Sequence, residues 1–248
     1  MKRLLVAFVF SLAISSLYAQ ETIFEETTTI YANETSGGIG MHTNGFMGTF
    51  RTGKYLTGFT KRIYEIEIGN IKHPKEIKSI NPFENDVRGY VFGKLNYFYF
   101  IRPSIGYHKV FIPKQSIRGV SVTYVVHGGL SLGLAKPVYL NIQEDEVGTG
   151  NKIIVRRRYD PEEHDQGDIY GRASFLNGMD EIRLYPGLFG KFGFHFDYGQ
   201  RREALRSIEV GIKTDVYMQE IPLMAFTDNS SYFLNLYLEI FFGQRKVE

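Results

Sequence analysis

The sequence has no cysteine, and beyond its N-terminus it has no apolar run long enough to cross a membrane as a helix. The absence of cysteine excludes disulfide bridges and thiolate chemistry. A spanning helix needs roughly 20 apolar residues, so helical membrane spans are excluded as well. Beyond the N-terminus, any crossing of a membrane would therefore need β-strands.

A strong charge of one sign is also missing. The formal net charge is +2, from 29 Lys and Arg against 27 Asp and Glu. Residues 1–19 contain Lys2 and Arg3, so their removal leaves 29 − 2 = 27 basic residues against 27 acidic ones. A surface that follows nucleic-acid phosphates needs an excess of Lys and Arg, so no nucleic acid is expected as a partner.

The N-terminus has the order of a secretory signal peptide. Lys2 and Arg3 precede an apolar run from Leu4 to Leu17, and Tyr18-Ala19-Gln20 follows. This order predicts cleavage after Ala19, whereas an uncleaved membrane anchor would need a longer run. We expect a signal peptide at 1–19 and a single exported domain at 20–248, a usual length for one all-β unit.

Strict alternation of apolar and polar residues is the main structural signal. Between Leu205 and Tyr217, one side carries Ile208, Val210, Ile212 and Val216, and the other carries Ser207, Glu209, Lys213, Asp215 and Tyr217. A period of two is that of a β-strand, and it recurs from 232 to 242. Strands are predicted at 38–51, 55–70, 91–107, 117–140, 181–197, 203–219 and 230–244, with a poorly alternating eighth at 22–32.

Short and long connections alternate between these strands. Tight turns are predicted at 51–54, 112–115 and 198–200, and longer connections at 71–90, 141–180 and 220–229. Outer-membrane barrels place short turns on the periplasmic side and long loops outside, and an even strand count puts both termini with the short turns. The pattern therefore predicts an all-β, antiparallel, up-and-down transmembrane barrel of eight strands. β-Branched residues at 152–155 leave ten strands as the alternative.

Alternation alone does not say which face is inside. A soluble sandwich or carrier also has one apolar and one polar face. An eight-stranded barrel has room inside only for side chains, so charges of opposite sign must pair there. The predicted interior residues are Lys61, Glu65, Glu67, Lys94, Arg102, Lys191, His195, Asp197, Glu209, Lys213, Asp215 and Glu239. The tyrosines expected at the bilayer interface are Tyr55, Tyr90, Tyr107, Tyr139, Tyr185 and Tyr232.

The chain resembles the small outer-membrane β-barrel proteins of Bacteroidota, broadly like the OmpA and OmpX barrels. The resemblance rests on the Ala19-Gln20 processing site, the alternating hairpins and a final strand at 235–242 that is similar to the aromatic barrel-assembly signal, although Gly243–Glu248 follows it. A looser likeness is to PorT-type barrels of the type IX secretion system.

The resemblance implies a place in the outer membrane, among its lipids and lipopolysaccharide. No particular family function is carried over. Our own leading hypothesis is a structural or interaction role that presents the loops at 71–90 and 141–180, in an envelope or secretion assembly with protein partners. No site residue is carried over from these barrels.

Three predicted inward residues are candidates for catalysis, namely His127, His195 and Asp197. Small barrel enzymes that acylate or deacylate lipid A use His, Ser and acidic groups, and Ser131 lies on the same predicted strand as His127. Residues four apart on a strand are about 13 Å apart, so His127 would need a nucleophile from another strand. A non-enzymatic protein is the main expectation, and a lipid A-modifying enzyme is the alternative.

Candidate ligand-binding residues lie in the longest predicted loop. Arg156, Arg157 and Arg158 could bind lipopolysaccharide phosphates through their guanidinium forks, or pair with acidic residues of the same loop. No HExxH or Ca²⁺-loop spacing occurs, so no metal or cofactor is expected. A soluble periplasmic ligand-binding barrel is the remaining alternative.

Overall fold

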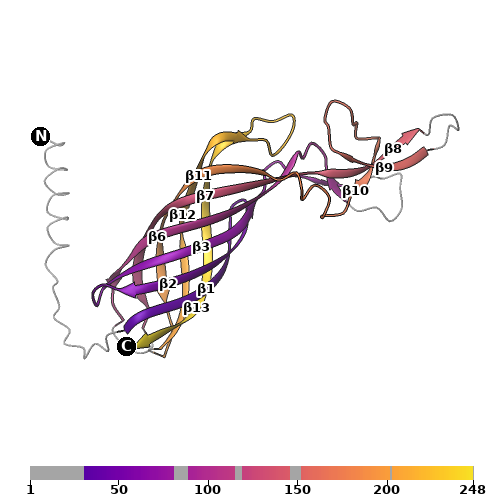
Figure 1. Cartoon of the computed structure of the whole chain (residues 1–248). Coiled ribbons are helices and arrows are strands. Elements are labelled where there is room, and N and C mark those ends of the chain that lie inside the picture. The colour runs from indigo at the N-terminus through magenta and orange to yellow at the C-terminus, as the bar shows by residue number, and fades with distance from the viewer. Residues whose placement is uncertain (1–30, 81–88, 115–118, 146–151, 202, 248) are drawn as a thin grey trace, which may run out of the picture. The chain divides into compact units, whose positions relative to one another are not determined.

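A closed barrel dominates the computed structural model, which describes residues 31–80, 89–114, 119–145, 152–201 and 203–247. Its wall runs in the order β1-β13-β12-β11-β7-β6-β3-β2, so each strand pairs antiparallel with the next wall strand along the chain (Figure 1). The wall strands are β1 (Tyr31–His42), β2 (Gly45–Tyr55), β3 (Thr60–Ile71), β6 (Asn96–Ile112), β7 (Ser121–Pro137), β11 (Arg183–Asp197), β12 (Ala204–Ile221) and β13 (Ser230–Val247). The prediction of an all-β, up-and-down barrel of eight strands is confirmed.

The two ends of the barrel differ. The β2–β3, β6–β7 and β11–β12 connections join strand ends at the end where β1 begins and β13 ends, which we call the terminal end. The β3–β6, β7–β11 and β12–β13 connections join strand ends at the other end, the loop end, where the short turn at 43–44 also lies. The predicted separation of the tight turns at 112–115 and 198–200 from the long loops is therefore confirmed.

The long loops have strands of their own. Residues 152–155 belong to β9 (Lys152–Arg158), which pairs with β8 (Tyr139–Asp145), and β10 (Ile169–Arg172) completes a separate three-stranded sheet. The loop before β6 contains a hairpin of β4 (Lys78–Ser79) and β5 (Tyr90–Val91). The alternative prediction of ten wall strands is therefore wrong, because these short strands pair with one another and not with the wall strands.

The N-terminal third of the barrel differs from the prediction. The predicted strand at 38–51 is interrupted by the turn at Thr43-Asn44, and Asn44-Gly45 is a typical hairpin signal that we missed. The predicted turn at 51–54 is wrong, because these residues lie within β2 and pair with both β1 and β3. Six glycines between 37 and 53 weaken the alternation that would have marked the strands. The predicted signal peptide and all but the last two residues of the predicted strand at 22–32 lie outside the described residues.

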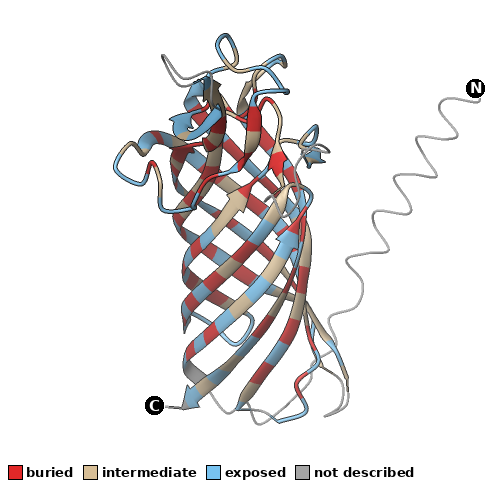
Figure 2. Ribbon diagram, turned by 90° about the vertical axis from the view of Figure 1, so that its right-hand side faces the viewer, coloured by how far each residue is buried: buried red, intermediate tan, exposed pale blue. Residues whose placement is uncertain are grey.

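The wall has polar side chains inside and apolar side chains outside. All twelve predicted interior residues are buried, and eleven of them lie on wall strands. The exception in position is Lys94, which lies in the loop before β6 and binds Glu76. On β13 the outward residues Leu234 and Leu236 are 65% and 66% exposed, and Figure 2 shows buried and exposed residues alternating along the wall. The inverse arrangement of a soluble carrier, with an oily interior, is absent from the described barrel.

The tyrosine prediction is only partly correct. Tyr107 and Tyr232 are exposed on the outside of the wall, as expected. Tyr185 is buried in the apolar cluster inside the barrel, and Tyr55 donates a hydrogen bond to the buried carboxylate of Glu34. Tyr90 and Tyr139 lie in the loop region. A position near the end of a strand did not by itself show whether a tyrosine ring points into the barrel or away from it.

Apolar side chains close the interior at the loop end. Phe98, Phe100, Tyr185, Tyr217 and Phe233 belong to one buried cluster, with the Phe98 and Tyr217 rings edge-on at 5.4 Å. A second cluster, of Tyr90, Val138, Leu140, Ile142, Tyr159 and Ile169, holds the loop sheet together. None of the described residues forms a helix long and apolar enough to cross a membrane.

Candidate functional site

The interior of the barrel holds one candidate site, an ionic network in three groups. At the terminal end, Glu34 accepts bonds from Lys61 Nζ at 2.8 Å and Arg245 Nε at 3.2 Å. Arg245 also binds Asp197, which Lys114 Nζ reaches at 3.2 Å. Glu34 and Arg245 come from β1 and β13, so this group ties the first wall strand to the last.

The middle group surrounds two carboxylates. Arg51 Nη1 and Nη2 donate to Glu209 at 2.8 and 2.9 Å, and Arg51 Nε donates to Glu65. Lys191 Nζ lies 2.5 and 2.8 Å from the two oxygens of Glu65. Tyr237 OH donates to Glu209 at 2.9 Å. Each buried charge therefore meets charges of opposite sign, as burial requires.

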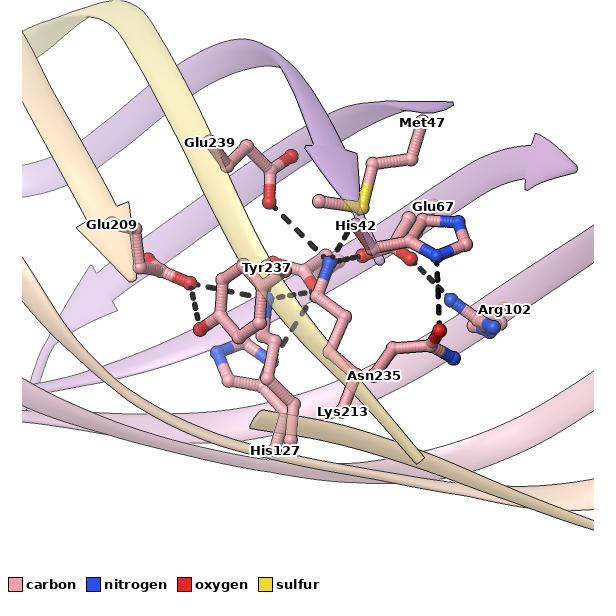
Figure 3. Close-up of polar contacts among 12 residues, drawn as sticks. His42, Met47, Glu67, Arg102, His127, Glu209, Lys213, Asn235, Tyr237 and Glu239 are labelled. Carbon is pink, nitrogen blue, oxygen red and sulfur yellow. Dashed lines mark hydrogen bonds and ion pairs between the residues drawn. The ribbon is translucent and has the colours of Figure 1, made fainter. Parts of the chain in front are cut away.

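The third group lies toward the loop end. Arg102 donates to Asp215 at 2.8 and 2.6 Å and to Glu67 at 2.6 Å. Lys213 binds Glu67 and lies 3.5 Å from Glu239 (Figure 3). β3 and β12, which carry Glu67 and Lys213, are directly opposite each other in the wall. The side chains therefore cross the full width of the interior.

The network balances its own charge. Its cations are Arg51, Lys61, Arg102, Lys114, Lys191, Lys213 and Arg245, seven in all, and its anions are Glu34, Glu65, Glu67, Asp197, Glu209, Asp215 and Glu239, also seven. With neutral histidines the sum is 7 − 7 = 0. An eight-stranded barrel filled in this way has a packed interior and does not enclose a water-filled pore.

His127 is not placed to activate a hydroxyl. Its Nε2 lies 2.8 Å from Nε2 of His108, and its Nδ1 lies 4.0 Å from Glu65. Ser131 Oγ instead donates to Asp215 at 2.9 Å and lies 2.8 Å from Tyr217 OH. His127 and Ser131 therefore belong to different parts of the network.

His195 and Asp197 also have separate structural partners. His195 Nδ1 lies 3.1 Å from Glu209, in the middle group. Asp197 binds Arg245 at the terminal end and accepts the backbone N–H of Gly199 at 2.9 Å. Both candidate histidines thus belong to the middle group, with ring centroids 5.1 and 5.7 Å from that of His108, whereas Asp197 belongs to the group at the terminal end. His108 was missed because the predicted strand ended at residue 107, although His108 continues the inward even-numbered positions of β6.

The three arginines of β9 do not converge on one ligand. Arg157 shares a face of the loop sheet with Glu144, to which it donates two bonds, at 2.8 and 3.1 Å. This pairing holds the pKa of Glu144 below its usual range. Arg156 and Arg158 alternate onto the other face, where Arg158 lies 3.3 Å from Glu181 and Arg156 lies 3.4 Å from Asn177.

A depression of about 610 Å³ lies in the loop region. It is lined by Leu95, Glu144, Arg157, Arg158, Tyr159, Asp160, Pro161, Glu163 and His164. Two of these residues, Arg157 and Arg158, were predicted ligand-binding candidates, but the contribution of Leu95 from another loop depends on tertiary packing. No group of three or more His, Asp or Glu residues in the described part of the chain is arranged to hold a metal ion.

No protein-family model and no curated protein matches the chain. The solved structures that are similar to it include the two that follow. Neisserial surface protein A is 11% identical, with 90% of this chain and 100% of that chain covered and a TM-score of 0.36. Ail, the attachment invasion locus protein of Yersinia pestis, is 7% identical, with 87% and 99% covered and a TM-score of 0.38. The barrel assignment therefore depends on the strand pairing of this chain itself.

Proposed function

We propose that this protein is a non-enzymatic outer-membrane β-barrel that presents structured loops outside the membrane to a protein partner in an envelope assembly. One observation carries the membrane part of the proposal. Apolar side chains cover the outside of a closed barrel, while paired charges fill its inside. A closed barrel satisfies every wall hydrogen bond internally, which the bilayer core requires.

The extent of the apolar belt supports the same assignment. On β13 the outward positions from Tyr232 to Phe242 are all apolar or aromatic, and the outward position beyond them is Gln244. Such a run covers about the 9–11 residues with which a tilted strand crosses a bilayer. Lipids and lipopolysaccharide are the surroundings that this surface fits.

The interior argues against transport and catalysis as the main role. Ion pairs cross the full width of the barrel, and the aromatic cluster that includes Phe98 and Phe233 closes the interior at the loop end. His127 and His195 are at most 3% exposed, so a lipid substrate has no route to their rings. The loop sheet, by contrast, lies outside the barrel wall. An interaction role is therefore favoured, in line with the looser likeness to PorT-type barrels.

Affinity purification of the tagged full-length protein in mild detergent tests the interaction role. We expect a protein partner to co-purify with the full chain. We expect it to be lost when residues 139–181, which contain the loop sheet, are replaced by a short Gly-Ser linker. The barrel should persist, because the β7–β11 ladder pairs Ser121–Ala135 with Arg183–Asp197 and does not involve this segment. Heat-modifiable migration on a denaturing gel checks that the shortened chain still forms a barrel. Recovery of the full chain alone in several mild detergents would refute the role in an assembly.

Cell fractionation and lipid analysis test the other parts. The protein should be recovered with outer membranes, and recovery in the soluble periplasmic fraction would overturn the membrane assignment. Lipid A mass spectra should be identical with and without the gene. A change in acylation that His127→Ala reproduces would contradict the non-enzymatic role.

A further inference from the structure

The depression described above is built by two different loops. Tyr159 N donates to Val138 O at 2.9 Å, and Val138 N donates to Leu95 O at 2.9 Å. These bonds join the loop before β6 to the loop sheet. Tyr159 and Val138 are also buried together in the second apolar cluster. The floor of the depression is therefore held in place by packing and by backbone hydrogen bonds.

Hydrogen-bond donors line one part of the depression. Arg157 uses Nε and Nη2 for Glu144, which leaves Nη1 without a bond to any described residue. His164 Nδ1 accepts the backbone N–H of Asp160 at 3.0 Å. In the neutral ring the hydrogen must then be on Nε2, which makes Nε2 a donor.

Acceptors and apolar surface line the rest. Asp160 and Glu163 are exposed carboxylates at the rim, and Asp160 uses Oδ1 to accept the backbone N–H of Glu162. Leu95 and Pro161 are half-buried and supply apolar surface. The lining thus combines donors, acceptors and a small apolar area.

The charges of the lining oppose an anionic ligand. Arg157 and Arg158 are outnumbered by Glu144, Asp160 and Glu163, so the sum with neutral histidine is 2 − 3 = −1. Both arginines are already paired with carboxylates. A phosphate would have to displace those carboxylates and approach the remaining acids. A hydroxyl group, which both donates and accepts, satisfies mixed partners without a net charge.

We propose that this depression binds a neutral saccharide, whose hydroxyl groups bond to Arg157, His164 and Glu163 and whose C–H face lies on Leu95 and Pro161. The volume lies within the range of about 300–1,000 Å³ that is usual for small-ligand sites. This proposal deepens the proposed function, because the loops would bind a glycan on their partner. It rests on the proposed position of these loops outside the membrane. The neutral sugars of a lipopolysaccharide chain and free oligosaccharides share this chemistry.

A glycan array probed with the purified full-length protein tests the proposal, in a detergent without a sugar headgroup. The array should carry neutral O-chain fragments, unrelated neutral oligosaccharides, and phosphorylated or sulfated glycans. We expect binding to neutral glycans, and the first two sets distinguish the two sources. Glu163→Ala and Arg157→Ala should each weaken binding roughly tenfold, the effect of losing a hydrogen bond to a charged group.

Two neighbouring residues provide matched controls. Glu162 is exposed beside Glu163, and Arg156 is exposed beside Arg157, and neither of them lines the depression. Glu162→Ala and Arg156→Ala should leave glycan binding unchanged. Each of three results would overturn the proposal. They are no binding to any neutral glycan, a preference for phosphorylated glycans, and equal losses of glycan binding in the control and test variants. The purified protein is used, so these outcomes are independent of the membrane location that fractionation tests.

Discussion

Arg51 and Glu209 form a two-point ion pair inside the barrel, although β1 and β13 separate their strands in the wall. Each residue also has a second partner, because Arg51 binds Glu65 and Glu209 accepts from Tyr237. The pair therefore joins distant parts of the wall through its interior. Its removal should affect the whole barrel.

Arg51→Met should destabilise the barrel by about 3–5 kcal/mol, because it leaves Glu65 and Glu209 buried without their main cation. Urea-induced unfolding from lipid vesicles measures the change. Adding Glu209→Gln to Arg51→Met should recover part of the loss, since it removes one of the uncompensated charges. The exposed Arg206 on β12 is the control, and Arg206→Met should change stability little. Equal losses for Arg51→Met and Arg206→Met would contradict the importance of the network.

Two consecutive glycines on β7 should respond differently to the same substitution. A Cβ at Gly129 would lie 2.2 Å from the backbone oxygen of Pro103, whereas a Cβ at Gly128 would meet nothing within 4 Å. Gly129→Ala should therefore cost about 1–3 kcal/mol, as overpacking does, and Gly128→Ala should be tolerated. Unfolding midpoints in urea measure both. Similar midpoints for the two variants would show that β7 and β6 are farther apart than described.

The apolar belt should be sensitive to charge in a way that depends on depth. Leu236 lies near the middle of the outward apolar run of β13, and Gln244 lies beyond its end on the same face. Leu236→Arg should cost about 2–4 kcal/mol and Gln244→Arg no more than about 1 kcal/mol. Folding into vesicles of defined lipid composition measures the difference. A protein that tolerates arginine at both positions is not embedded as proposed.

The loop before β4 should loosen on acidification. Burial lowers the pKa of His73, and the nearby Lys75 lowers it further. Between this depressed pKa and the usual value near 6.5, the unfolded loop binds more protons than the folded one, so the stability present above pH 6.5 is lost as the pH falls. The structural reason is that Nδ1 of His73 accepts the backbone N–H of Lys75, which a protonated nitrogen cannot do.

Hydrogen exchange of residues 72–79 at pH 7 and pH 5 measures this effect. Exchange should be faster at pH 5 once the intrinsic pH dependence is corrected. His73→Gln, which cannot be protonated, should remove the pH-dependent component. A component of the same size in His73→Gln would assign it to another group.

Alternation along single strands predicted much of the architecture. On β12 and β13 every residue from Ser207 to Tyr217 and from Phe233 to Phe242 lies on the predicted face, because a strand alternates its side chains irrespective of its partners. The parity of short and long connections predicted eight strands with the first at 22–32, whereas the structure reaches eight because a turn at 43–44 divides the predicted strand at 38–51. The last strand was predicted to end at residue 244, whereas β13 continues to Val247, and Arg245 in this extension completes the ion pairs of Glu34 and Asp197.

Sites that depend on distant partners were beyond the sequence. Arg51 was assigned to a turn because Arg-Thr-Gly-Lys looks like one, and only closure of the wall brings Arg51 to Glu209. The depression likewise needs Leu95 from one loop and Arg157 from another. The sequence by itself determined which residues share a face of each strand, and hence the strand type, because alternation depends on backbone geometry over a few residues. Only the tertiary structure decided which charges meet, because strand register and barrel closure set distances between residues far apart in the chain.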